Sequence, residues 1–254
     1  MNSTLDIEPG DNSNYCPVIQ KPHVIFYNLT NAGASAIVPI LTELLPKQFG
    51  YKVWGDPEHS EKYDLNFSEE EPTFHWTHSP KSLFQRYLPR EDFRFICLYR
   101  DPRDVLLSHV KDRFYVGDRS LEKMTEKEVF LEYICSNFGN MFNVADEWIH
   151  SNQDNVFVFP FEDLTKNVPL ATQQILSFLG LPVCQSILSE VCNRHSFESV
   201  TQRKRGEDGP IVRKGFLWRK GISGEWRNKF DPDVQAAFNI QFERILNRWG
   251  YNHS

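Results

Sequence analysis

Short apolar runs alternate with longer amphipathic segments along most of the chain. The runs at 23–28, 93–99 and 156–159 are rich in β-branched and aromatic residues, which predicts buried strands. Runs at 51–54 and 73–77 predict two more strands. Because almost wholly apolar strands are typical of parallel sheets covered on both faces, the pattern predicts an α/β fold with a central parallel sheet flanked by helices.

The segments between the apolar runs carry a helical period. The expected helices span 36–45, 80–88, a segment that begins at 101–102, 125–150, 169–179, 184–193 and 232–249. Residues 29–35 are small and turn-prone, and the acidic segment 56–72 is expected at the surface. The glycine-rich, basic stretch 201–224 is expected to be a loop.

Size and composition indicate one soluble domain. A chain of 254 residues can form a single α/β domain, expected at 22–254 behind a loose polar tail at 1–21 that lacks the pattern of a signal peptide. No apolar run approaches the roughly 20 residues of a membrane span. The net charge of −6 disfavours general nucleic-acid binding. Five cysteines without a C-x-x-C pair indicate reduced thiols and a cytoplasmic protein rather than disulfides or a zinc site.

Two segments follow predicted strands and could hold an anion, since ligands of parallel α/β sheets bind beyond the carboxyl ends of the strands. In 29–35, Gly33 permits close backbone approach, and the first N–H groups of the next helix can bind phosphate or sulfate. The segment lacks G-x-x-x-x-G-K-[ST], so it is no nucleotide-triphosphatase P-loop, and the alternative is an ordinary βα turn. Arg100 closes a strand with Ser108 two helical turns on, which suits a phosphate clamp or, alternatively, a helix start with salt bridges.

Two further features of the sequence could take part in binding or catalysis. The segment 201–221 concentrates basic residues in an acidic chain, which can attract a polyanion or can simply be a solvated face. His78 stands between a predicted strand and a turn, where a histidine can accept a proton near neutral pH. The alternative for a lone histidine is a structural role.

Together these segments resemble the cytosolic sulfotransferase family, whose motifs include P-K-S-G-T-T-W, T-H, R-[ND]-P-[KR]-D-x-x-x-S, Y-E-D-L and R-K-G-x-x-G-[DE]-W-[KR]-N-x-F. Residues 98–108 (LYRDPRDVLLS) match the third motif, and 219–230 (RKGISGEWRNKF) match the last almost position for position. Residues 161–164 (FEDL) match the fourth with Phe for Tyr, and Ser196-Phe197 resembles the adenine-side Ser-Phe of the family. A closing motif of this length is a specific signal.

The resemblance implies a sulfotransferase fold with a P-loop-like phosphosulfate-binding loop and no metal. The co-substrate would be 3′-phosphoadenosine 5′-phosphosulfate (PAPS), and the nucleotide product would be adenosine 3′,5′-bisphosphate (PAP). The 3′-phosphate would be held by Arg100, Ser108, Arg219, Lys220 and Gly221. The adenine would lie against Phe161, Ser196 and Phe197. The phosphosulfate would be wrapped by Asn31, Ala32, Gly33, Ala34 and Ser35.

The implied catalytic set is His78, Asn31 and Ser35, with His78 as the base that deprotonates a hydroxyl or amine of a small-molecule acceptor, as in small-molecule or secondary metabolism. Sulfuryl transfer resembles phosphoryl transfer, with in-line attack and charge building on the leaving oxygen. The protein would therefore act mainly by positioning groups and offering hydrogen-bond donors to that charge.

The chain departs from the family at several positions. The loop lysine of the family is Asn31, its two threonines are Ala34 and Ser35, and its following tryptophan is Ala36. Asn31 can donate a hydrogen bond but brings no charge, which leaves open a second hypothesis: a degenerate protein that binds PAP or PAPS and transfers nothing. A third hypothesis, nucleic-acid binding through the basic segment, is disfavoured by the net charge. The usual dimer motif, K-x-x-x-T-V-x-x-x-E, is replaced by RNKFDPDVQA, which predicts a monomer or a different dimer.

Overall fold

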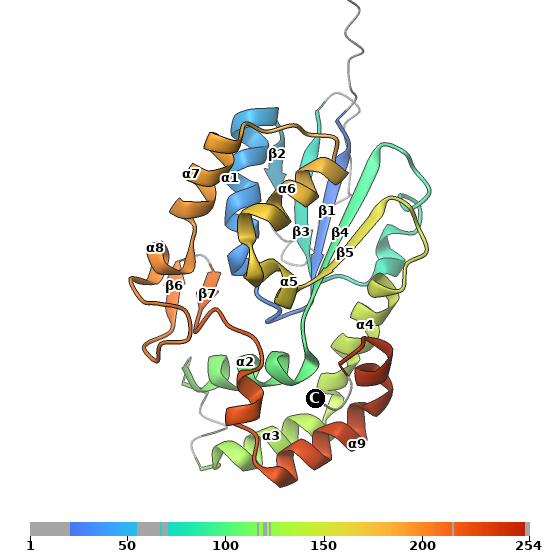
Figure 1. Cartoon of the computed structure of the whole chain (residues 1–254). Coiled ribbons are helices and arrows are strands. Elements are labelled where there is room, and N and C mark those ends of the chain that lie inside the picture. The colour runs from blue at the N-terminus through green and yellow to red at the C-terminus, as the bar shows by residue number, and fades with distance from the viewer. Residues whose placement is uncertain are drawn as a thin grey trace, which may run out of the picture.

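The computed structural model describes residues 21–54, 67, 71–115, 117–118, 121, 123–214 and 216–251. The expected N-terminal tail lies outside the described residues except for its last residue, and so does most of the expected acidic excursion at 56–72. The described part is built around one five-stranded sheet (Figure 1).

The sheet is parallel throughout, as predicted. Its strands are β1 (His23–Asn28), β2 (Lys52–Trp54), β3 (Thr73–Thr77), β4 (Phe93–Tyr99) and β5 (Val156–Pro160). They lie in the order β2-β3-β1-β4-β5, and every neighbouring pair is parallel. The carboxyl ends of β1, β3 and β4 therefore meet at one edge, since β1 lies between the other two.

Helices cover both faces of this sheet. The described α-helices are α1 (Val38–Phe49), α2 (Pro102–Tyr115), α3 (Glu126–Cys135), α4 (Asn140–Ile149), α5 (Phe161–Lys166), α6 (Val168–Phe178), α7 (Gln185–Arg194), α8 (Phe197–Thr201) and α9 (Pro232–Arg248). Helices α1, α6 and α7 pack together beside the sheet, while α4 packs on β4 and α3 packs on α9 (Figure 1).

The two sheet faces have separate aromatic cores. Trp148 of α4 stacks on Tyr27 of β1 at 5.4 Å between ring centroids and lies 5.6 Å from Phe95 of β4. On the opposite face, Phe26 contacts Phe159. Adjacent residues of a strand point to opposite faces, so Phe26 and Tyr27 serve the two cores and the central strand β1 is buried on both sides.

One predicted long helix is wrong. The segment 125–150 is interrupted at Ser136, whose backbone is extended (φ −86°, ψ −172°) and whose hydroxyl accepts a 3.1 Å hydrogen bond from the N–H of Phe138. A serine that bonds its own neighbouring backbone competes with the helix, so α3 ends at Cys135 and a short 3₁₀ turn, Asn137–Gly139, precedes α4.

Two other predictions also need correction. The expected helix at 80–88 is only a 3₁₀ turn at Lys81–Phe84. The expected loop at 201–224 contains an antiparallel hairpin of β6 (Val212–Lys214) and β7 (Phe216–Trp218). A further 3₁₀ turn, Glu225–Asn228, begins just beyond this segment and precedes α9. The hairpin is short enough that its alternation carries little signal in the sequence. Within the described ranges, no helix is both long and apolar enough to cross a membrane.

Candidate active site

A cavity of about 550 Å³ lies beyond the carboxyl ends of the central strands. Its wall takes residues from the loops after β1, β3 and β4 and from the segment after β7. The cavity is lined by all but one of the site residues that the sequence analysis proposed: Asn31, Gly33, Ala34, Ser35, His78, Arg100, Ser108, Phe161, Ser196, Phe197, Arg219, Lys220 and Gly221. The exception, Ala32, belongs to the same loop but is fully buried.

The loop after β1 turns sharply because two of its residues are left-handed. Asn31 has φ 61° and Gly33 has φ 93°. Asparagine tolerates this conformation better than most residues, and glycine does so without penalty. A Cβ on Gly33 would lie 2.3 Å from the Phe161 ring, so glycine is also required by the close approach of α5.

Arg100 is held at the end of β4 by contacts on several sides. Its guanidinium donates a 2.7 Å hydrogen bond to the carbonyl oxygen of Ile222 and lies 3.5 Å from the carboxylate of Asp104. It also lies over the Phe161 ring at 4.4 Å from the centroid. These contacts leave Nε of Arg100 buried without a hydrogen-bond partner.

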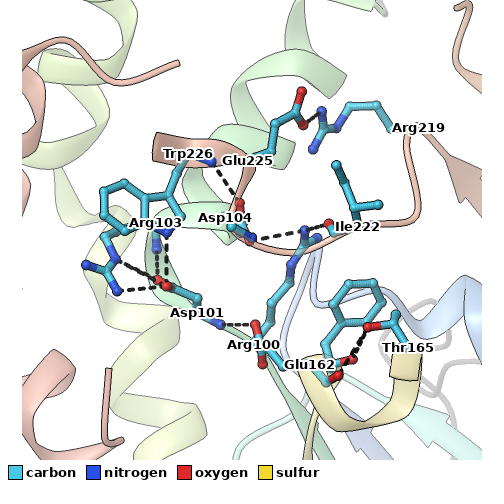
Figure 2. A network of polar contacts seen from close by, with 12 residues as sticks. Arg100, Asp101, Arg103, Asp104, Glu162, Thr165, Arg219, Ile222, Glu225 and Trp226 are labelled. Atoms are coloured by element: carbon cyan, nitrogen blue, oxygen red, sulfur yellow. Dashed lines mark hydrogen bonds and ion pairs between the residues drawn. The ribbon is translucent and has the colours of Figure 1, made fainter. Parts of the chain in front are cut away.

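The fully buried carboxylate of Asp104 ties the later cationic segment to α2. It accepts hydrogen bonds from the backbone N–H groups of Gly224, at 2.5 Å, and Trp226, at 3.1 Å. Figure 2 shows Asp104 between Arg100 and the turn at Glu225–Trp226. The segment after β7 is thereby fixed over the end of β4.

Arg219 and Lys220 share one buried carboxylate. Arg219 forms an ion pair with Glu225, and Nζ of Lys220 lies 2.7 Å from the other oxygen of Glu225 (Figure 2 draws the first pair). Burial raises the pKa of Glu225, but the hydrogen bonds and charges of Lys220 and Arg219 outweigh it and lower the pKa overall. Glu225 is therefore ionised, and Lys220 has a second carboxylate partner, because its Nζ also lies 2.6 Å from Asp208.

The two arginines are electrostatic neighbours. Burial lowers the pKa of Arg100, and the charge of Arg219 lowers it further, whereas Asp104 opposes both. Arg100 and Arg219 are far apart in the sequence, yet both line the same cavity. The cavity wall consequently gathers three cationic side chains, each paired with a carboxylate: Arg100 with Asp104, Arg219 with Glu225, and Lys220 with Glu225 and Asp208.

The C-terminal end of the basic segment, at Arg219 and Lys220, is not a solvated face. Only 12% of the Arg219 side chain and 14% of the Lys220 side chain are exposed. Arg203 donates hydrogen bonds of 3.0 Å to the carbonyl oxygens of Arg219 and Pro210, which braces the same segment from behind. Of the two alternatives, the low exposure of Arg219 and Lys220 at the cavity favours an anion site for this end of the charge run.

Aromatic rings form a second part of the wall. Phe197, at the start of α8, is buried, and its ring centroid lies 6.2 Å from that of Trp218 in β7. Gly221 (φ 67°) approaches this ring so closely that a Cβ there would lie 2.7 Å from it. Ser196 uses its hydroxyl to cap α8 by accepting from the N–H of Ser199.

His78 has a defined tautomer. Its Nδ1 lies 2.7 Å from the carbonyl oxygen of Asn28, at the end of β1, and 3.3 Å from the side-chain amide of the same residue. The shorter contact decides which ring nitrogen carries the proton. Because a carbonyl oxygen can only accept, Nδ1 carries the proton and Nε2 of the neutral ring keeps a lone pair. His78 and Asn28 both line the cavity. This geometry suits a group that accepts a proton.

Several residues of the site were not singled out in the sequence. They include Asn28, Trp218, Glu225 and His109, whose Nδ1 lies 3.1 Å from Nδ2 of Asn31. Asn28 ends a predicted strand, which is a signal that could have identified it. The others depend on contacts between distant segments. Among the described residues, no cluster of three or more His, Cys, Asp or Glu residues could hold a metal ion.

Comparison with known proteins gives one family. A family model described as a sulfotransferase domain matches residues 11–250. Human sulfotransferase 2A1 is 27% identical over 186 residues, a match that spans 70% of this chain and 65% of the human protein, so just under two thirds of that relative is covered. Mouse sulfotransferase 2B1 is 27% identical over 180 residues, 67% of this chain and 53% of that protein.

Solved structures share the fold. The mouse sulfotransferase SULT7A1 complexed with PAP has a TM-score of 0.71 at 18% identity and covers 91% of this chain and 90% of its own. Retinol dehydratase in a complex with retinol and PAP has a TM-score of 0.63 at 20% identity and covers 89% of this chain and 82% of its own.

Proposed function

Because the chain belongs to the sulfotransferase family, we propose that its cavity binds PAPS and that it transfers the sulfuryl group of PAPS to a hydroxyl or amine of a small-molecule acceptor. The observation that carries this proposal is the convergence of Arg100, from the end of β4, with Arg219 and Lys220, from beyond β7, on one cavity wall. A doubly charged ribose phosphate suits such a place, because arginine and lysine bind phosphate through charge-assisted hydrogen bonds.

Several residues of the cavity support a site for the 3′-phosphate of the nucleotide. Arg100 and Arg219 are each paired with a carboxylate, but the Nε atoms of both are buried without a hydrogen-bond partner, so each guanidinium keeps an unused donor. The hydroxyl of Ser108, on α2, and the backbone of Gly221 line the same region and would complete the 3′-phosphate site. A phosphate would add charge-assisted hydrogen bonds to these cations beyond those to their carboxylate partners.

The other parts of the nucleotide have matching surfaces. Phe197 and Phe161 offer flat apolar rings to the adenine, in keeping with the preference of aromatic faces for stacking. The turn at 31–35, with its two left-handed residues, can turn successive backbone N–H groups toward an anion. We assign this turn to the 5′-phosphosulfate. PAPS supplies the activated sulfuryl group when bound, and no metal is needed in this proposal.

His78 acts as the base. Its Nε2 takes the proton of the acceptor hydroxyl or amine as the acceptor atom bonds to sulfur and the bond from sulfur to the 5′-phosphate oxygen breaks. The carbonyl oxygen of Asn28 holds the ring by accepting from Nδ1, so the accepted proton makes an imidazolium that stays oriented. Asn31 and Ser35 donate to the oxygen on which negative charge builds, which is the stage where fixed donors contribute most.

One specific observation favours a second candidate, a protein that binds PAP or PAPS without turnover. Asn31 occupies the place of the family lysine, and a neutral amide stabilises a leaving phosphate less than an ammonium does. The presence of His78 at the cavity, with Nδ1 held by the carbonyl oxygen of Asn28, favours turnover instead, because it leaves Nε2 as the nitrogen that can accept a proton.

Two measurements separate these candidates. Calorimetry with PAP tests nucleotide binding, and transfer of ³⁵S from PAPS to a panel of phenols, alcohols and amines tests catalysis. Binding with acceptor-dependent transfer supports the proposed enzyme. Binding without transfer across the panel supports the second candidate, and absence of PAP binding contradicts both.

A further inference from the structure

Asn31 is the loop residue whose side chain most needs support. It replaces a long cation with a short neutral amide, and its backbone is already left-handed at φ 61°. An amide presents a donor at one end and an acceptor at the other, so a rotation about its last bond would turn an acceptor toward an incoming anion. A group that fixes this rotation therefore decides whether Asn31 presents a donor or an acceptor to the anion.

His109 is placed to fix the rotation of the Asn31 amide. Nδ2 of Asn31 lies 3.1 Å from Nδ1 of His109, which directly follows Ser108 on α2. An amide nitrogen only donates, so Nδ1 of His109 accepts and the ring proton resides on Nε2. Burial, followed by the charge of Arg113, lowers the pKa of His109, in keeping with a neutral acceptor.

The His109 ring is itself held by aromatic neighbours. Its centroid lies 4.9 Å from that of Tyr133 of α3, at 81°, and 5.0 Å from that of Phe138. The edge-to-face contact with Tyr133 and the tilted contact with Phe138 restrict the ring, and α2 supplies a rigid backbone beneath it. His109 does not line the cavity, so it reaches the ligand only through Asn31.

We propose that His109 is a positioning residue that holds the Asn31 amide with a hydrogen-bond donor available to the 5′-phosphosulfate. This rests on the proposed function and deepens it: the pair would do by orientation part of what a loop lysine does by charge. Asn31 donates through one amide hydrogen to His109, which leaves the second hydrogen for the ligand. The consequence is a site whose catalytic donor depends on a residue outside the cavity.

Two substitutions at His109 separate orientation from packing. His109→Phe keeps an aromatic ring against Tyr133 and Phe138 but removes the acceptor. His109→Asn loses the ring but places an acceptor oxygen the same number of bonds from the backbone as Nδ1. We expect His109→Phe to lower kcat with PAPS about 10- to 100-fold, the scale on which misplaced catalytic groups lose rate. The Kd for PAP, which lacks the sulfuryl group, should change less than about 3-fold, and His109→Asn should recover most of the rate.

A double-variant cycle tests the route through Asn31. If His109 acts only by orienting Asn31, the variant Asn31→Ala/His109→Phe will be no slower than Asn31→Ala alone. The inference would be overturned if the losses in kcat multiplied in the double variant, or if His109→Phe were fully active. A His109→Asn variant as slow as His109→Phe while remaining equally stable would overturn it as well.

The inference has a test that needs no turnover. Nitrogen-15 NMR of the ring reports the tautomer of His109 in the free wild-type protein. We expect a proton on Nε2, an unprotonated Nδ1, and a shift of the Nδ1 resonance in Asn31→Ala. A proton on Nδ1 would refute the positioning role even in an active enzyme. Wild-type protein that neither binds PAP nor transfers ³⁵S would instead refute the proposed function, with the tautomer still measured separately.

Discussion

The guanidinium of Arg100 donates a 2.7 Å hydrogen bond to the carbonyl oxygen of Ile222, across 122 residues of sequence. This bond joins the end of β4 to the turn that follows Arg219–Gly221. Asp104 adds two more bonds to the same turn through the N–H groups of Gly224 and Trp226. The wall that we propose binds the 3′-phosphate is therefore held together by hydrogen bonds between side chains and backbone, which is the arrangement expected of a preorganised site.

Removal of the Arg219 side chain should weaken nucleotide binding. Arg219→Ala deletes one charge-assisted hydrogen bond and is expected to cost about 1.5–3 kcal/mol in PAP binding. Calorimetry with PAP measures this directly. Arg227→Ala, which removes an exposed cation outside the cavity wall, is the matched control and should leave the Kd unchanged. Equal affinities for Arg219→Ala and wild type would show that the 3′-phosphate is not bound here.

Removal of His78 should abolish turnover and spare binding. His78→Ala deletes the proposed proton acceptor, and loss of such a group typically costs about 10²- to 10⁴-fold in rate. The Kd for PAP should stay nearly unchanged, since no phosphate contact is removed. Single-turnover transfer of ³⁵S from PAPS provides the measurement. Normal turnover in this variant would mean that another group accepts the proton.

Gly33 should be intolerant of a methyl group for a steric reason. In Gly33→Ala the new Cβ would lie 2.3 Å from Phe161, in addition to the strain of φ 93°. We expect a loss of PAP affinity together with about 1–3 kcal/mol of stability, as for an overpacked contact. Gly50→Ala separates the two effects, because Gly50 is also left-handed (φ 71°) but an added methyl there would have nothing within 4 Å. Equal effects of both variants on PAP binding would contradict the steric explanation.

Acid should destabilise the fold through His75. Burial, followed by the charge of His23, lowers the pKa of His75 from 6.5 to about 4. The unfolded chain therefore binds more protons than the native state between these values, so stability is complete above about pH 6.5 and falls as the pH drops toward 4. The full shift corresponds to about 3 kcal/mol.

Urea unfolding at pH 7 and pH 4.5 checks this dependence. His75→Phe keeps a ring beside Trp54, on which His75 stacks, but removes the titration. The variant should lose less stability than wild type over the same interval. Identical losses in the two proteins would assign the acid sensitivity to other groups.

Much of the fold was predictable from local pattern. All five strands of the sheet were expected within about two residues of their observed bounds, helped by the burial of the central strands β1 and β4 on both faces, which makes them almost wholly apolar. The helices α6, α7 and α9 were expected because each alternates apolar and polar positions at the helical period. The break at Ser136 was missed because it depends on a single side-chain bond that the surrounding helical pattern obscures.

The chemistry available to this protein can be read from its residues in order: the strand ends that carry Arg100 and His78, the basic segment near the C-terminus, and the motifs that indicate the family. Which of these groups meet is a matter of packing. The bond from Arg100 to Ile222, the support of Asn31 by His109 and the tautomer of His78 all join segments far apart in the chain. Hydrophobic periodicity is a local property, whereas such contacts depend on how the helices and strands pack, and so no short window of sequence contains them.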